Sequence, residues 1–277
     1  MPFPVPAPIG IFDSGYGGLT ILDDIVRRLP DYDYIYLGDN ARAPYGNRSF
    51  DVVYEFTLQS VRKLFSMGCP LVILACNTAS AKALRNIQQR DLPLLDPSRR
   101  VLGVIRPTVE LVGTISHTRH VGVLGTLGTI SSCSYPLELH KLFPDISVAQ
   151  RACLLWASIV EAGECRSVGA DFFVRQDVSA LLADDPLLDT VILACTHYPL
   201  LLPKIQAVMP PSVRILSQGP VVADSLADYL KRHPEMDLRL SKNATVQYLT
   251  TENPERFSAA ASVFLSSPVE ARRVTLF

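Results

Sequence analysis

Two cysteines stand in the same sequence setting, each at the end of a run of apolar residues. The pentapeptide Val-Ile-Leu-Ala-Cys occupies residues 72–76 and recurs letter for letter at residues 191–195, 119 positions later. A thiolate is a base, and a helix N-terminus or a proton-accepting neighbour makes it more available. Two such thiols on opposite sides of one substrate could remove a proton from one face and return a proton to the other.

Polar residues follow each of these cysteines. Asn77 and Thr78 come after Cys76, and Thr196 and His197 come after Cys195. Amide, hydroxyl and backbone N–H groups can hold a carboxylate, and an imidazole can exchange a proton with a thiol near neutral pH. These flanks and the repeat favour a chemical role for both thiols over space filling.

The remaining cysteines have no such setting, and we expect them to fill space in the core. They are Cys69, Cys133, Cys153 and Cys165. The chain has no Cys-x-x-Cys pair and no paired ligand spacing, so neither a disulfide framework nor a metal site is expected. We expect free thiols and a reducing, cytoplasmic compartment.

A glycine-rich segment, Asp-Ser-Gly-Tyr-Gly-Gly at residues 13–18, follows the first apolar run. It does not match a phosphate-binding loop, because Gly-Lys-[Ser/Thr] is missing and Thr20 occupies the last glycine position of G-x-G-x-x-G. A carboxylate, Asp13, and a hydroxyl, Ser14, remain beside a loop with room for a ligand. Asp13 as an ordinary helix cap is the alternative.

Two further segments carry polar groups without an evident role of their own. Residues 39–46 form a turn anchored by Pro44, with backbone N–H groups and the Tyr45 hydroxyl. Glu161 follows an apolar helix and could be only its end.

Short apolar runs alternate with amphipathic stretches along the chain. We expect buried strands at residues 9–12, 34–37, 71–75, 101–105, 121–124 and 191–194, because these runs do not alternate with polar residues. Apolar stripes with helical spacing predict helices over residues 19–29, ended by Pro30, and 50–65, capped by Gly68. The alternation predicts an α/β protein with parallel sheets.

The repeat indicates two related halves. A weaker echo pairs residues 10–14 with residues 122–126, an offset of 112 that is close to 119. Residue types that are common in buried strands could produce one such match by chance, but two matches in the same order favour an internal duplication of the chain. Each cysteine then lies at the carboxyl edge of a parallel sheet, where α/β proteins bind ligands. A pseudo-two-fold axis would place Cys76 and Cys195 across one cleft.

Composition sets the outer limits. The 277 residues are 48% hydrophobic and 19% charged, which is enough for one large or two small packed domains. The formal net charge of −1 excludes the basic footprint of a nucleic-acid-binding protein. No apolar run reaches the roughly 18 residues of a membrane span, and the first basic residue is Arg27, so no signal peptide is expected.

Taken in order, these motifs resemble the glutamate racemases, a family of the cofactor-independent aspartate/glutamate racemase superfamily. The matching segments lie at residues 12–18, 38–46, 75–79, 125–129, 195–200 and 250–253, with Phe257 and residues 264–265 near the end. The resemblance covers nearly the whole chain. It departs from the family at Asn40, where a small hydroxyl residue is expected, and at Arg106, where an acidic one is expected.

The resemblance implies interconversion of L- and D-glutamate with no pyridoxal phosphate or metal. Cys76 would act on D-glutamate with the help of Asp13, and Cys195 would act on L-glutamate with the help of His197. Glu161 matches a third acidic residue of the family's site. The residues implied to bind substrate are Ser14, Tyr45, Gly46, Asn77, Thr78, Thr129 and Thr196. The product would supply D-glutamate for peptidoglycan.

The resemblance also implies two pseudo-symmetric α/β domains that face each other across the active-site cleft. One would comprise residues 1–98 and 209–277, and the other residues 99–208. Closure of the domains would exclude water, and the family suggests a homodimer. The alternatives are a racemase for aspartate or another acidic amino acid, a catalytically inactive amino-acid-binding relative, and a dithiol redox pair with Cα atoms under about 7 Å apart.

Overall fold

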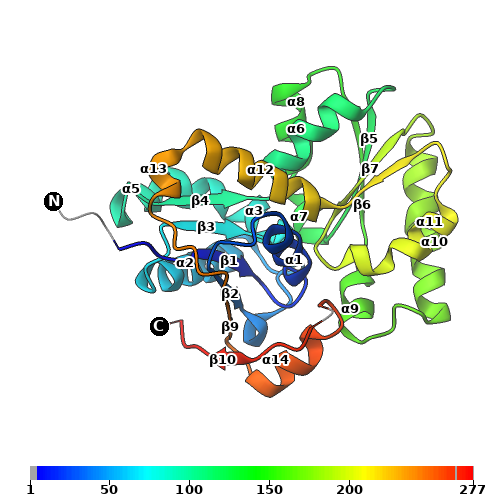
Figure 1. Ribbon diagram of the computed structural model, residues 1–277. Coiled ribbons are helices and arrows are strands. Elements are labelled where there is room, and N and C mark those ends of the chain that lie inside the picture. Colours follow the sequence, from blue (N-terminus) through cyan, green and yellow to red (C-terminus); the bar gives the residue numbers. More distant parts are fainter. Residues whose placement is uncertain (1–4, 266, 277) are drawn as a thin grey trace.

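The structure, a computed structural model, describes residues 5–265 and 267–276. Two sheets form its framework, and every strand pairing in them is parallel. The first sheet has the order β10-β9-β2-β1-β3-β4 and the second the order β6-β5-β7-β8. Figure 1 shows the sheets side by side, with helices on both faces of each. The expected α/β class with two parallel-sheet domains is confirmed.

The strands of the first sheet are β1 (Ile9–Asp13), β2 (Tyr34–Gly38), β3 (Leu71–Leu74), β4 (Arg100–Gly103), β9 (Val246–Thr250) and β10 (Ala271–Arg273). Those of the second are β5 (His120–Gly125), β6 (Ser147–Ala152), β7 (Thr190–Ala194) and β8 (Arg214–Leu216). The sub-orders β2-β1-β3-β4 and β6-β5-β7-β8 are the same. Because the two repeat copies fall on corresponding strands, β3 and β7, the shared order supports the internal duplication.

The α-helices are α1 (Leu19–Arg28), α2 (Phe50–Ser66), α3 (Asn77–Lys82), α4 (Leu84–Asn86), α5 (Leu92–Leu95), α6 (Ile105–Ile115), α7 (Leu127–Ser131), α8 (Ser134–Leu142), α9 (Trp156–Glu161), α10 (Val168–Asp184), α11 (Leu202–Val208), α12 (Gln218–Arg232), α13 (Pro234–Asp237) and α14 (Pro254–Ala261). Short 3₁₀ turns lie at Asn40–Arg42 and Tyr198–Leu201, and a π turn at Ile87–Asp91. Within the described ranges, no helix combines the length and the apolar character that a membrane crossing requires.

The two predicted helices are confirmed as α1 and α2. Ser49 caps α2 by accepting a hydrogen bond from the Val52 N–H, and Gly68 follows the helix with a φ of 96°, a conformation that favours glycine. The predicted strand over residues 101–105 is too long, because α6 begins at Ile105. Pro107 lies in the first turn of that helix, where its missing N–H leaves no intrahelical bond unmade.

Four strands were not predicted: β6, β8, β9 and β10. They are half-exposed or short, and three of them lie at the edge of a sheet, so their sequences lack the continuous apolar run of a doubly covered strand.

The chain passes from one sheet to the other at residues that differ from the predicted domain boundaries. β4 lies beyond residue 98 but pairs with β3 in the first sheet, and the Arg100 N–H donates to the Pro70 carbonyl. β8 lies beyond residue 208 but pairs with β7 in the second sheet, and the Arg214 N–H donates to the Asp189 carbonyl. The domain limits stay a prediction; the strand pairing places β4 in the first sheet and β8 in the second.

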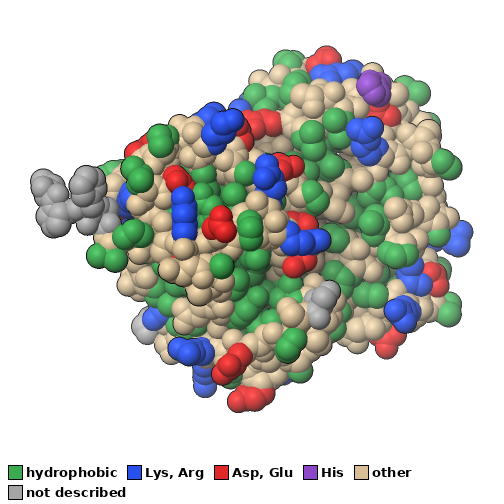
Figure 2. All heavy atoms as spheres, viewed as in Figure 1, with side chains coloured by type: hydrophobic (Ala, Val, Ile, Leu, Met, Phe, Trp, Pro, Cys, Tyr) green, Lys and Arg blue, Asp and Glu red, His purple; other side chains and the backbone are tan. Residues whose placement is uncertain are grey.

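Both faces of each sheet carry a hydrophobic core, whereas acidic and basic side chains are scattered among apolar ones on the outer surface that Figure 2 shows. In the first sheet, Ile9 and Ile11 of β1 pack with α1 and α12, whereas Phe12 packs with α2 on the opposite face. The second sheet is covered by α10 and α11 on one face and by α6 and α8 on the other. Helix α12 follows β8 of the second sheet and runs back over α1 of the first, so it ties the halves together (Figure 1).

Helices α6 and α8 approach each other at a glycine. A Cβ atom at Gly113 of α6 would lie 1.9 Å from the Phe143 ring, which follows α8. The Arg119 guanidinium lies 5.4 Å from the centre of the same ring and limits its movement. The contact therefore requires a residue without a side chain.

We expect Gly113→Ala to lower the free energy of unfolding by about 1–3 kcal/mol, the usual cost of overpacking. In an open helix the same change would raise stability by up to about 1 kcal/mol. Gly169→Ala in α10, where the added Cβ would meet only the Ser167 hydroxyl at 3.6 Å, is the matched control. Urea unfolding of both variants checks this, and equal stabilisation would contradict the close contact.

Candidate active site

A small cavity of about 60 Å³ lies where the carboxyl ends of the two sheets meet. The first half contributes the predicted site residues Ser14, Tyr45, Gly46, Cys76, Asn77 and Thr78 to its wall. The second half contributes Glu161, Cys195, Thr196 and His197. The cavity has room for a few water molecules, and so fits a small polar ligand. The structure thus brings both cysteines to one cavity.

Cys76 lies between β3 and α3. Its Sγ accepts a hydrogen bond from the Ala79 N–H at 3.5 Å and lies 3.4 Å from the Ser14 Oγ. Burial raises the pKa of Cys76 to about 12, and the nearby Asp13 charge acts in the same direction. At neutral pH this thiol therefore carries a proton that it can donate.

Asp13 ends β1 and lies behind the cavity wall rather than in it. Its Oδ2 accepts the Gly15 N–H at 2.9 Å, whereas its buried Oδ1 has no hydrogen-bond partner among the described residues. Burial raises the pKa of Asp13, although the His197 charge opposes this. A carboxyl group with one unpartnered oxygen in this position can hold or pass a proton near Cys76.

Cys195, His197 and Glu161 form a chain. Cys195 Sγ lies 3.7 Å from His197 Nδ1, and His197 Nε2 lies 3.0 Å from Glu161 Oε1. Burial alone would lower the pKa of His197, but its hydrogen bonds to Cys195 and Glu161 outweigh burial and raise the pKa to about 10. His197 is therefore an imidazolium at neutral pH, and its charge lies beside Cys195.

The glycine-rich segment serves a close approach between the halves. A Cβ atom at Gly17 would lie 2.3 Å from Thr196 Oγ1 and 2.5 Å from His197 Nδ1. Nearby, the Thr20 hydroxyl donates to the Thr196 carbonyl at 3.2 Å. The glycine thus lets the loop after β1 touch the loop after β7, which accounts for a glycine-rich turn that does not match a phosphate loop.

Tyr45 lines the cavity, but its hydroxyl is already engaged. It donates to the fully buried Asp39 carboxylate, which also binds the Arg42 Nε at 2.7 Å and the Thr251 hydroxyl at 2.9 Å. The hydroxyl therefore has no proton left for a ligand, but its oxygen can still accept a hydrogen bond. The expected binding role of Tyr45 and Gly46 stays a prediction.

Thr129 is fully buried and does not line the cavity. Its hydroxyl lies 3.1 Å from that of Thr126 and 3.4 Å from that of Thr78, so it supports two residues that do line the wall. Thr126 was not predicted as a site residue, although the echo of residues 10–14 at 122–126 pairs it with Ser14. Ser158 and Asn47 also line the cavity, and no sequence signal marks them.

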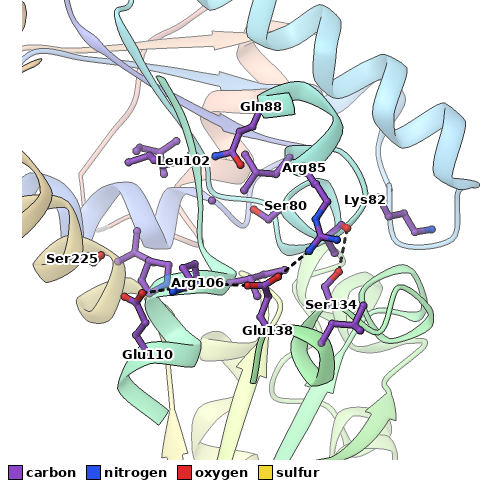
Figure 3. Close-up of a pocket in the computed structure, with 18 of the residues that line it drawn as sticks. Ser80, Lys82, Arg85, Gln88, Leu102, Arg106, Glu110, Ser134, Glu138 and Ser225 are labelled. Atoms are coloured by element: carbon purple, nitrogen blue, oxygen red, sulfur yellow. Dashed lines mark hydrogen bonds and ion pairs between the residues drawn. The ribbon is translucent and has the colours of Figure 1, made fainter. Parts of the chain in front are cut away.

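A second and larger cavity, of about 590 Å³, contains neither cysteine. It lies among α3, α4, α6, α8 and α12, and Figure 3 shows the ion pairs along it. Glu138 contacts Arg85 at 3.0 Å and Arg106 at 3.5 Å, and Arg106 also binds Glu110 at 2.7 Å. The Arg106 departure from the family pattern therefore lies at this second cavity. The larger cavity is not the candidate active site, because the thiol, carboxyl and imidazole groups with raised pKa values lie at the smaller cavity.

The other sequence expectations concern metal and disulfides. The part of the chain that the structure describes holds no group of three His, Cys, Asp or Glu residues placed to bind a metal ion. All six cysteines are free, and Cys133 is the exposed one. The Asn40 departure lies beside the loop after β1, where Asn40 Oδ1 accepts the Thr250 hydroxyl at 3.0 Å.

Known proteins match this architecture over its length. The sequence profile of the Asp/Glu/Hydantoin racemase family matches residues 10–226. A glutamate racemase of Roseobacter denitrificans is 43% identical over 272 residues, covering 95% of this chain and 98% of the relative. The crystal structure of glutamate racemase isoform RacE1 from Bacillus anthracis matches with a TM-score of 0.88 and 33% identity, covering 97% of both chains.

The glutamate racemase of Francisella tularensis, solved in complex with D-glutamate, matches with a TM-score of 0.85 and 31% identity over 98% of both chains. These matches extend through both sheets and the cavity between them. The chain therefore belongs to the Asp/Glu/hydantoin racemase family, among its glutamate racemases, and is an isomerase of the racemase class.

Proposed function

We propose that the chain interconverts L- and D-glutamate by proton transfer between two thiols, Cys76 and Cys195. The observation that carries this proposal is that the cysteines follow corresponding strands of the two halves and line one cavity. The family membership supports a racemase, and the D-glutamate bound to the Francisella tularensis relative supports the substrate.

The reaction must remove the α-proton of an amino acid, which is only weakly acidic. A thiolate removes such a proton only where water is excluded and hydrogen-bond donors stabilise the charge that develops on the carboxylate. Both cysteine residues are only 6% exposed. Ser14, Asn77, Thr78 and Thr196, with the backbone at Gly46, supply donors around the cavity, and Thr129 supports Thr78. We assign these residues to binding the carboxylate and ammonium groups.

The Cys76 thiol, protonated at neutral pH, sets the direction of the first transfer. Cys195 Sγ, beside the His197 imidazolium, takes the α-proton of L-glutamate. The protonated Cys76 thiol then donates its proton to the opposite face of the carbanion, which gives D-glutamate. The D-to-L direction runs with the proton positions reversed. In both directions Asp13 assists Cys76, whereas His197, which is held by Glu161, assists Cys195.

The alternatives from the sequence become outcomes of the tests. A racemase for aspartate or another acidic amino acid would share the two thiols, an inactive relative would bind without exchange, and a redox role would need a Cys76–Cys195 disulfide. The supply of D-glutamate to peptidoglycan, a cytoplasmic location and a homodimer stay predictions. A growth defect rescued by D-glutamate after loss of the gene would test the first of these.

The first experiment follows deuterium during turnover. In D₂O, early D-glutamate formed from L-glutamate should carry deuterium at Cα, while recovered L-glutamate should still carry hydrogen, because two bases exchange with solvent separately. Proton NMR and chiral chromatography measure this without added pyridoxal phosphate and with chelator present. Transfer of the original proton to the product would contradict two bases. Exchange of the α-proton of aspartate but not of glutamate would show an aspartate racemase instead. Exchange with neither amino acid would favour the inactive, amino-acid-binding relative.

Cys76→Ser and Cys195→Ser should each lower kcat at least about a thousandfold, since a hydroxyl cannot replace the thiol as acid or base at neutral pH. Glutamate binding, measured by calorimetry, should persist, because the binding groups remain. Cys133→Ser, at the exposed thiol, is the control and should keep full activity. Near-normal turnover in either active-site variant would end the two-thiol mechanism.

Glu161→Gln should lower the pKa of His197 from about 10 toward its ordinary 6.5, because the paired charge is lost. The imidazole resonance, assigned with His197→Asn, can be titrated by NMR, with the exposed neighbour Glu164→Gln as the control.

The raised pKa of His197 stabilises the folded chain fully below pH 6.5, and that stabilisation is lost as the pH rises through about 10. The stability difference between wild type and Glu161→Gln should therefore shrink over this range. If His197 has the same pKa in Glu161→Gln as in the wild type, Glu161 does not stabilise the imidazolium.

A further inference from the structure

Three buried side chains form a closed ring of hydrogen bonds behind Cys76. Asn77 Nδ2 donates to Gln218 Oε1 at 2.6 Å, Gln218 Nε2 donates to the Tyr135 hydroxyl at 2.8 Å, and that hydroxyl donates to Asn77 Oδ1 at 2.7 Å. Asn77 and Gln218 are 2% exposed and Tyr135 is fully buried. Every member gives one hydrogen bond and accepts one within the ring.

The ring fixes which way the Asn77 amide faces. Reversal of Asn77 alone would set its Oδ1 against Gln218 Oε1 and leave the Tyr135 O–H without an acceptor in the ring. Reversal of both amides is opposed because Gln218 Nε2 also donates to the Val104 carbonyl at 3.4 Å, and a carbonyl only accepts. Burial raises the pKa of Tyr135, so its hydroxyl stays protonated and keeps donating. Chains of hydrogen bonds that run in one direction also strengthen one another. The orientation of Asn77 is therefore set by its two partners.

The ring joins elements from both halves of the molecule. Asn77 begins α3 after β3 of the first sheet, Tyr135 lies in α8 of the second half, and Gln218 begins α12, which follows β8 and crosses back to the first half. Gln218 Nε2 also contacts the Thr108 hydroxyl of α6 at 2.8 Å, a bond outside the ring. The packing of three helices thus determines the position of one amide.

The ring leaves one part of Asn77 unused. Its amide carries two N–H groups, of which one binds Gln218, and Asn77 also lines the small cavity. We propose that Gln218 and Tyr135 are positioning residues that hold the second Asn77 N–H toward the substrate beside Cys76. The proposal rests on the proposed racemase function. Nothing in the sequence patterns marks either residue.

The test separates a positioning role from a structural one with a double-mutant cycle. Gln218→Met keeps the length of the side chain and breaks the ring, and Tyr135→Phe removes one hydroxyl from it. Each should lower kcat/KM for glutamate about tenfold, the effect of about one buried hydrogen bond. Asn77→Ala removes the amide itself. In that background, Gln218→Met and Tyr135→Phe should cause no further loss of kcat/KM, because they act through the missing side chain.

Thr108→Val is the matched control, because it removes a fully buried hydrogen-bond partner of the same Gln218 amide but leaves the ring closed. It should lower the melting temperature while kcat/KM stays within about twofold of wild type. Tyr135→Phe decides the outcome if Gln218→Met does not fold.

Unchanged kcat/KM in both ring variants, or losses that add to that of Asn77→Ala, would overturn the positioning role. A loss in Thr108→Val equal to that in Gln218→Met would overturn it too, since general loosening would then explain both. The unsubstituted protein, run in the same assay, separates the two hypotheses. If it does not racemise glutamate, the proposed function falls and the positioning role with it, whereas an active protein with additive losses overturns the positioning role alone.

Discussion

The contact of Gly17 with Thr196 and His197 sets how closely the two halves of the molecule approach. Any side chain at position 17 would overlap both residues, since a Cβ atom there would lie 2.3 Å from Thr196 Oγ1. Without this approach, the loops after β1 and β7 would separate, and water would fill the space between the thiols. A weak base such as a thiolate acts on a weakly acidic proton only when water is excluded. The absence of one side chain is thus the condition on which the enclosed cavity depends.

Enclosure in turn determines where the protons lie. Burial raises the pKa of Cys76 to about 12, so the first half holds a protonated thiol, and burial shifts the pKa of Asp13 in the same direction. In the second half, contacts with Cys195 and Glu161 raise the pKa of His197 to about 10 despite burial, so that half holds a positive charge. A buried charge needs a partner, and Glu161, whose side chain is 30% exposed, supplies one from a partly solvated position. The same low-polarity environment therefore yields a proton donor on one side and a charged imidazole on the other.

Local sequence determines part of this arrangement. The repeated apolar runs ending in Cys76 and Cys195 predict two buried strands with a thiol at each carboxyl end, because a doubly covered strand reads as a continuous apolar run. The helical stripe over residues 50–65 predicts α2 for a similar reason. Edge strands such as β8 lack this signal, so they were not predicted. The engagement of the Tyr45 hydroxyl by Asp39, and of Asn77 by Gln218 from 141 positions away, depends on the assembled fold and has no local pattern. Thr126 lies between these cases, since its pairing with Ser14 was visible in the repeat.

Duplication gave the two halves the same strand order but different neighbours for the thiols. Cys76 has Ser14 and a carboxyl group, whereas Cys195 has an imidazole and a more distant carboxylate. Such asymmetry is compatible with a reaction between mirror images. The two enantiomers have equal free energy in water, so kcat/KM must be equal in the two directions whatever the site contains, because their ratio is the equilibrium constant. What the neighbours can change is the protonation state in which the free enzyme rests, and hence kcat and KM separately. The Asn77 ring adds to this asymmetry, because it orients a donor beside Cys76 alone.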